Sequence, residues 1–225
     1  MLLYLINIEL SVLASLLRFG SGSRAGRLGP RPEIPLLLYD FEACPYCRKV
    51  REALTNLDIT TDIRPCPKGG TVYRQELMRR GGKAQFPYLV DPNTDSEMYE
   101  SDAIIDYLYS QYGAARPPRH LRLPVVTNFL VWLAMFARSG QGLKARAART
   151  PKEPLSLWGY EASPGTRLVR ELLSVLEIPY RLTPAAPTRE SAGKVKVPLL
   201  HDPDNRIDVQ GTRAILGHLK QNWVG

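Results

Sequence analysis

Apolar and polar residues follow one another along the chain in blocks that predict a definite order of strands and helices. Residues 36–39 form a short apolar run typical of a buried strand, and Val50, Leu54 and Leu57 recur on one side of a helix over residues 48–57. The pattern then predicts a strand at residues 60–63, a helix over 71–80, a hairpin with strands at 88–90 and 97–99, and a helix over 101–112. The predicted order is βαβαββα. A crossover makes the first two strands parallel and the hairpin adds two antiparallel ones, which gives a four-stranded mixed sheet covered by helices.

The chain contains this unit twice. Residues 35–54 (PLLLYDFEACPYCRKVREAL) align without gaps to residues 154–173 (PLSLWGYEASPGTRLVRELL), and 11 of the 20 positions are identical. Pro87 later matches Pro198 at an offset of 111 instead of 119, so the second copy is eight residues shorter between these points. A match of this length in a chain of ordinary composition indicates a duplicated domain.

An apolar segment that predicts a helix precedes each copy. In residues 1–18 the polar residues Asn7, Ser11, Ser15 and Arg18 recur at helical spacing, and the rest of that surface is apolar. We expect this amphipathic helix to pack on the protein's own core or on a second subunit, with attachment to a membrane surface as the alternative. A similar apolar helix is predicted at residues 129–138. The predicted division of the chain is therefore a helix and linker (1–33), a first domain (34–116), a second helix and linker (117–152) and a second domain (153–225).

Composition narrows the class of protein. The net charge of +8 and the pI of about 9.5 would suit an anionic partner, but the basic residues are dispersed and no nucleic-acid-binding motif is present, so nucleic acid is not an expected partner. Three cysteines are too few for the disulfide framework of a secreted domain, which favours a reducing, cytoplasmic location. The three histidines lie far from the cysteines without paired spacing, so no metal site is expected.

Cys44 and Cys47 form a CxxC motif between the first strand and the following helix. A thiol at the amino terminus of a helix faces unpaired backbone N–H groups and the positive end of the helix dipole, both of which stabilise a thiolate. Arg48 and Lys49 follow directly and are expected to add to this effect. The pattern therefore predicts an accessible, acidic Cys44 that acts as nucleophile, with Cys47 able to resolve a mixed disulfide. The alternative is that both thiols are inert core residues.

The motif and its surroundings are similar to a known family. CPYC matches the active-site tetrapeptide typical of glutaredoxins, and the wider patterns YDFEACPYCRKVREAL, GGKAQFPYLVDPN and YESDAIIDYL resemble the amino-terminal, thioredoxin-fold domain of glutathione transferases. The resemblance covers nearly the whole chain except the two leading helices. It implies an α/β protein with two tandem thioredoxin-like domains, each of the order βαβαββα and each preceded by an amphipathic helix.

The resemblance also implies which residues bind glutathione. Phe86 would pair through its backbone with the cysteinyl moiety, next to Pro87, which is cis in the family. Glu100 and Ser101 would hold the γ-glutamyl group, and Ser101 is also expected to cap the last helix of the domain. The cations that could meet the glycyl carboxylate are Lys83, Arg74 and Arg79.

The second copy departs from this pattern at each chemically important position. Ser163 and Thr166 replace the two cysteines, and Gly211 and Thr212 replace the Glu-Ser pair. We expect this copy to have a structural role, although Ser163 leaves open a serine of the kind that some glutathione transferases use. Cys66, at the end of the second strand, is expected to be a bystander cysteine, with a third redox thiol as the alternative.

The leading functional hypothesis is a glutathione-dependent thiol-disulfide oxidoreductase that acts on disulfide or glutathionylated substrates. Conjugation of glutathione to electrophiles is one alternative. Another is a noncatalytic module that binds glutathione, another ligand or an iron-sulfur cluster, and a third is a redox adaptor held at a membrane surface by residues 1–18. A homodimer is left open.

Overall fold

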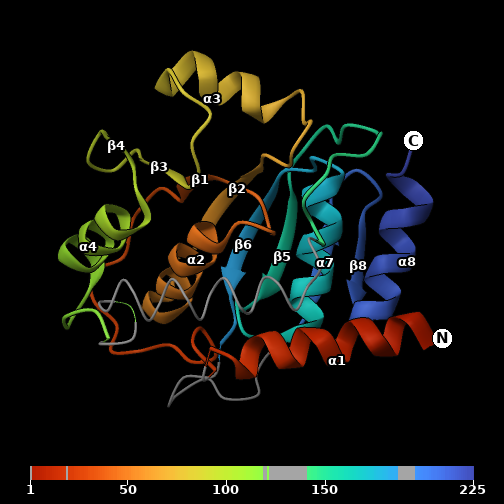
Figure 1. Ribbon diagram of the computed structural model, residues 1–225, viewed down its shortest axis with the longest axis horizontal. Coiled ribbons are helices and arrows are strands. Elements are labelled where there is room, and N and C mark those ends of the chain that lie inside the picture. Colours follow the sequence, from red (N-terminus) through yellow and green to blue (C-terminus); the bar gives the residue numbers. More distant parts are fainter. Residues whose placement is uncertain (1, 19, 119–120, 122–140, 187–195) are drawn as a thin grey trace.

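The computed structural model describes residues 2–18, 20–118, 121, 141–186 and 196–225. Within these residues the two copies share one eight-stranded sheet, whose strand order is β4-β3-β1-β2-β6-β5-β7-β8 (Figure 1). The leading helix α1 spans Leu2–Leu16. The elements of the first copy are β1 (Leu36–Asp40), α2 (Pro45–Leu57), β2 (Thr61–Pro65), α3 (Tyr73–Gly81), β3 (Tyr88–Asp91), β4 (Ser96–Tyr99) and α4 (Ser101–Tyr112). Those of the second copy are β5 (Leu155–Gly159), α7 (Pro164–Val175), β6 (Tyr180–Pro184), β7 (Leu199–Asp202), β8 (Ile207–Gln210) and α8 (Thr212–Asn222).

The predicted order βαβαββα is confirmed for the first copy. In each copy the first two strands pair in parallel and the hairpin strands pair antiparallel, as the crossover argument requires. In the second copy, the second helix of this order is predicted between β6 and β7, a stretch that includes residues 187–195, which lie outside those described. The helix predicted at 129–138 also falls outside the described residues.

The two halves of the sheet meet along an antiparallel pair of central strands, β2 and β6. Asp62 lies opposite Arg181 in this pair, and these two residues occupy equivalent positions in the two copies. An approximate twofold axis therefore passes through the middle of the sheet. Each copy forms the four-stranded mixed sheet that the sequence predicts, and the copies join edge to edge through β2 and β6.

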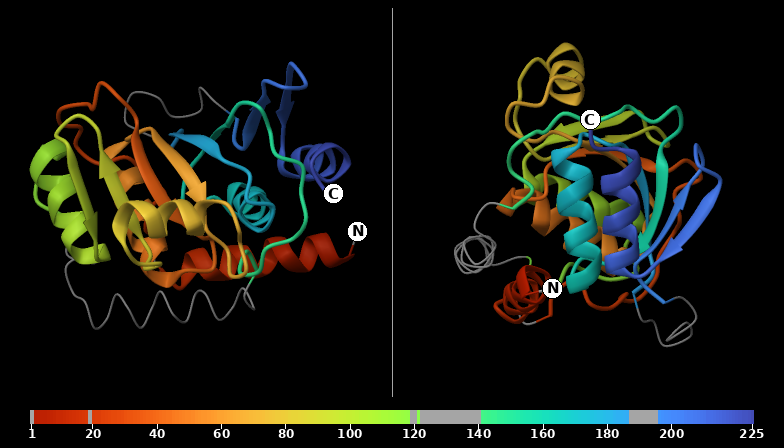
Figure 2. Two further views of the ribbon diagram at one scale, coloured as in Figure 1. Left: turned by 90° about the horizontal axis from the view of Figure 1, so that it is seen from above. Right: turned by 90° about the vertical axis from the view of Figure 1, so that its right-hand side faces the viewer.

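Alternation along the strands separates two hydrophobic clusters on opposite faces of the sheet. Leu36 and Leu38 of β1 belong to the larger cluster, which continues through α2, α4, α7 and α8 of both copies. Tyr39 points to the other face and packs with Tyr73 and Leu77 of α3. Figure 1 shows α3 apart from the other labelled helices, and Figure 2 shows α7 and α8 side by side. The larger cluster therefore forms a core that both copies share.

Helix α1 packs across α7 of the second copy with its polar stripe inward. Ser11 is fully buried and Arg18 is 3% exposed, while Leu13 and Leu16 on the outer side are exposed. The hydroxyls of Ser11 and Ser15 donate to the carbonyls of Pro164 and Ala162, near the start of α7. The helix thus packs on the protein itself, as expected, but through polar side chains. Across the described residues, we find no helix with the length and apolar character needed to cross a membrane.

Candidate functional site

The two cysteines lie where β1 passes into α2. Cys44 is the N-cap of α2, and its sulfur accepts a hydrogen bond from the backbone N–H of Cys47 at 3.3 Å. Pro45 occupies the first helical turn, where a missing N–H costs no hydrogen bond. The helix ends at Asp58, whose left-handed backbone (φ 56°) accompanies the capping hydrogen bonds to Leu54 and Thr55. The predicted placement of Cys44 at a helix amino terminus is confirmed.

The environment of the two thiols separates their acidities. Burial alone raises the pKa of Cys44, but the hydrogen bonds from the Cys47 thiol and amide, together with the charge of Arg51, bring this pKa below its ordinary value. Burial raises the pKa of Cys47 well above its ordinary value, and the hydrogen bond to Cys44 and its charge add to the rise. Of the two thiols, Cys44 is therefore the one that loses its proton more readily.

The cation that acts on Cys44 is different from those expected. Arg48 and Lys49 are both fully buried and turned to other partners: Arg48 Nε bonds Glu52 at 3.2 Å and Lys49 Nζ bonds Asp102 at 2.5 Å. Arg51, two turns after Cys44 on α2, supplies the positive charge instead. Arg48 and Arg51 follow Cys44 by four and seven positions, so helical periodicity would allow either of them to face the thiol. Their partners separate them, because Arg48 bonds Glu52 farther along α2, whereas Arg51 pairs with Asp40 at the end of β1, where the CxxC loop begins.

The prediction of an accessible nucleophile is wrong for this structure. Cys44 is 4% exposed and Cys47 is fully buried, while Tyr46 between them is 39% exposed. The sulfur of Cys44 is turned toward the first N–H groups of α2, because it serves as their acceptor, and this turns it away from solvent. The residue expected to act as nucleophile therefore has little contact with solvent.

The residues around Phe86 lie against the CxxC loop. The ring of Phe86 packs edge-on against Phe41, which precedes Cys44 by three residues, with ring centroids 5.6 Å apart. The Phe86–Pro87 peptide bond is cis, as the family resemblance implies. The guanidinium of Arg74 lies 4.8 Å from the Phe86 ring centroid, and its Nε donates to the carbonyls of Cys66 and Pro67. The structure thus brings Phe86 and Pro87 to the same end of the sheet as the thiols.

Of the three candidate cations, Arg74 is the one that contacts this region. Its guanidinium also lies 5.9 Å from the ring of Phe41. Lys83 instead stacks over Tyr99, with its Nζ 4.4 Å from the ring centroid, and Arg79 is exposed in the last turn of α3. Of these three cations, Arg74 therefore lies beside Phe86 and Phe41.

The Glu-Ser pair begins helix α4, but not in the expected way. Glu100 is the N-cap residue and Ser101 is the first helical residue, and neither side chain caps the helix. The prediction that Ser101 caps α4 is therefore wrong, because Glu100 takes the cap position with a positive φ of 69°. The Glu100 carboxylate accepts a hydrogen bond from the Gln85 amide, which ties it to the residue before Phe86.

The corresponding site of the second copy is closed by side-chain packing. The Ser163 hydroxyl accepts from the N–H of Thr166 at 3.3 Å and from its hydroxyl at 2.9 Å. A Cβ built on Gly165, which corresponds to Tyr46, would lie 2.2 Å from the hydroxyl oxygen of Thr212. The Val197–Pro198 bond is also cis. This copy thus retains the backbone of the site without its thiols and without room for a side chain at residue 165.

Cys66 lies apart from the thiol pair in its contacts. It is fully buried in the cluster under α3, and its S–H donates to the carbonyl of Arg64. Burial raises the pKa of this thiol far above its ordinary value. These properties fit the expected bystander cysteine.

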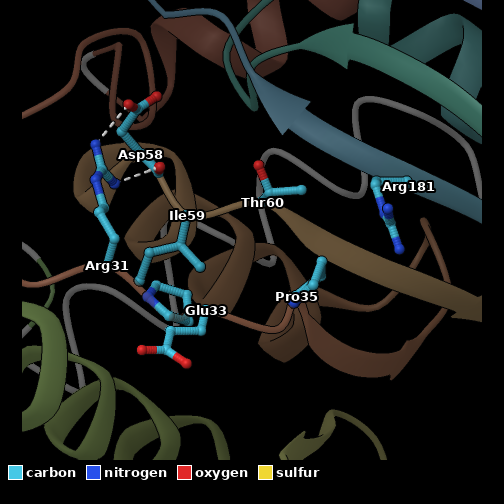
Figure 3. Close-up of a pocket in the computed structure, with 8 residues that line it drawn as sticks. Arg31, Glu33, Pro35, Asp58, Ile59, Thr60 and Arg181 are labelled. Atoms are coloured by element: carbon cyan, nitrogen blue, oxygen red, sulfur yellow. Dashed lines mark hydrogen bonds and ion pairs between the residues drawn. The ribbon is translucent and has the colours of Figure 1, made fainter. Parts of the chain in front are cut away.

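A cavity of about 420 Å³ lies at the opposite end of the strands (Figure 3). It is lined by residues that precede β1 and β2 and by Arg181 near the start of β6, whereas the CxxC loop follows the end of β1. Arg31 there forms an ion pair with Asp58 at 2.7 Å and donates to the last carbonyls of α2, so its charge caps that helix. In the part of the chain that the structure describes, no group of three or more histidine, cysteine, aspartate or glutamate side chains could hold a metal ion.

Sequence reasoning missed the groups behind the thiols. Asp40, the last residue of β1, is buried and pairs with Arg51 at 2.5 Å, and both residues act electrostatically on Cys44. One signal for Arg51 was available, because Arg51 and Arg170 match between the copies while the intervening chemistry does not. The packing of Phe41 against Phe86 has no comparable signal in the sequence.

Comparisons with known proteins agree with this architecture. The model of the glutathione S-transferase N-terminal domain matches the chain twice, over residues 38–117 and 157–224. The glutathione S-transferase-like protein tpcF of Aspergillus fumigatus is 30% identical over 116 residues, which cover 49% of this chain and 49% of that protein. The chain therefore matches about half the length of this relative. A glutathione transferase of Bombyx mori, BmGSTD1, aligns with a TM-score of 0.35 and 23% identity over 42% of this chain and 45% of that one. With both halves of the chain matched by the same domain model, the protein belongs to the glutathione S-transferase family and carries two copies of its N-terminal domain.

Proposed function

We propose that the protein is a glutathione-dependent thiol-disulfide oxidoreductase in which Cys44 is the nucleophile and Cys47 the resolving thiol. The observation that carries the proposal is the hydrogen bond from the Cys47 N–H to the Cys44 sulfur at the start of α2, which stabilises a thiolate on Cys44. Family membership supports glutathione as the co-substrate. The second copy, with Ser163 and Thr166 at these positions, serves the structure.

The reaction follows from thiol chemistry. The Cys44 thiolate attacks the glutathione sulfur of a glutathionylated protein, the S–S bond breaks, and the released protein thiolate takes up a proton. The mixed disulfide between Cys44 and glutathione is then attacked by the thiolate of a second glutathione, which yields oxidised glutathione and restores the Cys44 thiolate. With a disulfide substrate, the Cys47 thiolate can instead displace the substrate thiolate from Cys44, which forms a Cys44–Cys47 disulfide. Two glutathione molecules then reduce this disulfide to the two thiols and leave as oxidised glutathione.

Glutathione would bind along the edge formed by Phe86, Pro87 and the start of α4. The exposed Glu100 carboxylate offers a partner for the γ-glutamyl ammonium, and the N–H groups that begin α4 suit its carboxylate. Arg74, which lies over Phe86, is our choice for the glycyl carboxylate, since a guanidinium can bind a carboxylate through two hydrogen bonds.

The low exposure of Cys44 favours one competing function, a noncatalytic module that binds glutathione without forming a covalent bond to it. The two functions differ in whether Cys44 reacts. A catalytic Cys44 must form a mixed disulfide with glutathione, which increases the mass of the protein by that of one glutathione moiety. A binding module would bind glutathione and keep both thiols free.

The decisive experiment is a glutathione-coupled reduction assay with a glutathionylated peptide, comparing the protein with Cys44→Ser and Cys47→Ser. Cys44→Ser should abolish turnover without unfolding the protein, because serine already fills the equivalent N-cap position in the second copy. Cys47→Ser should retain activity and accumulate a mixed disulfide visible by mass spectrometry. Equal rates in all three proteins would exclude the proposed activity, and glutathione binding without turnover would favour the noncatalytic module.

A further inference from the structure

The seam between α2 and α7 holds a buried cluster of ion pairs to which both copies contribute. Arg51 Nε pairs with Glu161 of the second copy at 2.9 Å, and Arg170 Nη2 pairs with Glu42 of the first copy at 3.0 Å. Each arginine also contacts the glutamate of its own copy, at 3.2 Å for Arg51 and 2.7 Å for Arg170. All four side chains are at most 4% exposed. The cluster is complete only when both copies are present.

Arg51 connects this cluster to the thiol site. It lies seven residues after Cys44, which is two turns along the same face of α2, and side chains on a helix lean toward its amino terminus. Its Nη1 pairs with Asp40, the last residue of the strand that leads into the CxxC loop. The same guanidinium therefore contacts the base of the active-site loop and a carboxylate of the copy that has no thiols.

We propose that Glu161 is a positioning residue for Cys44, because it holds the Arg51 guanidinium at the base of the CxxC loop and neutralises part of its charge. This inference rests on the proposed function, in which Cys44 is the nucleophile. The second copy then contributes to the chemistry of the first through a single carboxylate.

The effect has a definite sign. Arg51 lowers the pKa of Cys44, and a carboxylate bonded to Arg51 weakens the positive potential at the sulfur. The charged and titratable groups that act on Arg51 or contact it are Asp40, Glu42 and Cys47 from the first copy and Glu161, Arg170 and Tyr180 from the second. The Glu161 carboxylate also faces Arg48 at 3.8 Å and Arg167 at 4.0 Å. A thiolate that is too acidic is a poorer nucleophile, so Glu161 keeps Cys44 closer to the pKa at which attack is fastest.

The test is a pH titration of Cys44 by NMR of protein labelled with ¹³C at cysteine Cβ, which requires neither turnover nor access to a reagent. Glu161→Gln keeps the shape and one oxygen for Arg51 but removes the charge. We expect the Cys44 pKa to fall by about half a pH unit, which is roughly threefold more thiolate at acidic pH. Glu161→Asp keeps the charge but draws it back from Arg51, so a smaller fall is expected, and this variant carries the test if the glutamine variant does not fold.

The matched control is Asp62→Asn, which removes a carboxylate that bridges the copies to Arg181 at 2.7 Å but does not bond Arg51. It should leave the Cys44 pKa unchanged. An unchanged or higher pKa in the Glu161 variants, or an equal fall in Asp62→Asn, would overturn the inference. The two proposals fail separately: a wild-type protein without turnover but with the expected shift would exclude the oxidoreductase activity alone, and an active protein without the shift would exclude the role of Glu161 alone.

Discussion

The two copies begin their second element with the same cap but with different atoms. In the first copy a cysteine sulfur accepts the N–H three residues on, and in the second a serine oxygen accepts it at the same distance of 3.3 Å. Serine is among the best N-cap residues and cysteine is not, so the fold itself is served better by Ser163 than by Cys44. The thiol in the first copy therefore requires an explanation other than stability, and thiol chemistry supplies one.

The copies also differ at the residue before their last helix, where the second copy again has the residue that suits the fold better. The residue before the last helix has a positive φ in both, 69° at Glu100 and 89° at Gly211. Glycine adopts this backbone without strain, whereas a side chain there costs on the order of 1–3 kcal/mol. The second copy has the residue that suits the backbone, and the first keeps a carboxylate beside the thiol loop at the expense of strain.

The copies agree, in contrast, along their seam. Both retain the glutamate and the arginine that form the reciprocal pairs, Glu42 with Arg170 and Glu161 with Arg51. A buried pair needs both partners, because a buried charge left alone is very unfavourable. The second copy thus differs from the first at the proposed active site and keeps the residues that join the two copies.

The largest effect is expected from exchanging the sites. A variant with Cys44→Ser, Cys47→Ser, Ser163→Cys and Thr166→Cys carries the thiols in the second copy alone. We expect its turnover in the glutathione-coupled assay to be lower than that of the wild type by roughly a thousandfold, as for loss of a nucleophile. The reasons are that Thr212 crowds Gly165 and that Gly211 offers no carboxylate. Wild-type turnover would show that the copies differ only in their thiols.

The next largest effect is expected from breaking the buried ion pairs between α2 and α7. Arg170→Met leaves the buried carboxylates of Glu42 and Glu161 short of a partner, and we expect the free energy of unfolding to fall by about 3–5 kcal/mol in urea titrations. Asp62→Asn breaks the more exposed ion pair to Arg181, where Arg181 is 49% exposed, and should cost less than about 1 kcal/mol. Similar losses in the two variants would mean that the buried cluster contributes no more than the surface pair.

Much of the fold could be predicted because local patterns determine it. The repeat, the strand and helix order of the first copy and the position of Cys44 at a helix start all follow from short-range spacing and are confirmed. The joining of the two sheets through β2 and β6 could not be predicted. Each of these strands is the edge strand of its own copy, and the local sequence of an edge strand does not indicate which other strand will pair with it.

The candidate site was predictable in its residues but not in its electrostatics. Arg48 and Lys49 seemed suited to Cys44 because they are adjacent in sequence, yet each is buried against a carboxylate. Arg51 acts instead, since its ion pair with Asp40 at the end of β1 holds it beside the CxxC loop. Exposure of Cys44 was likewise misjudged, because capping the helix turns the sulfur inward. Such properties depend on contacts between distant segments.

The smallest effect is expected from replacing Glu100, and it distinguishes the backbone strain at this residue from its proposed part in binding glutathione. Glu100→Gly should leave the free energy of unfolding within about 1 kcal/mol of the wild type, because relief of the positive φ offsets the greater backbone entropy of glycine in the unfolded chain. The KM for glutathione should rise about tenfold, which corresponds to the loss of one charge-assisted hydrogen bond to the γ-glutamyl ammonium.

A matched control is available in the same domain. Asp95 also has a positive φ, 53°, but lies in the turn between β3 and β4, so Asp95→Gly should affect stability in a similar way and leave the KM unchanged. If Glu100→Gly stabilised the protein and left the KM at the wild-type value, the carboxylate would have no part in binding glutathione. The strained backbone of the first copy would then be an inherited feature that the second copy has relieved, and the contrast between Glu100 and Gly211 would carry no functional meaning.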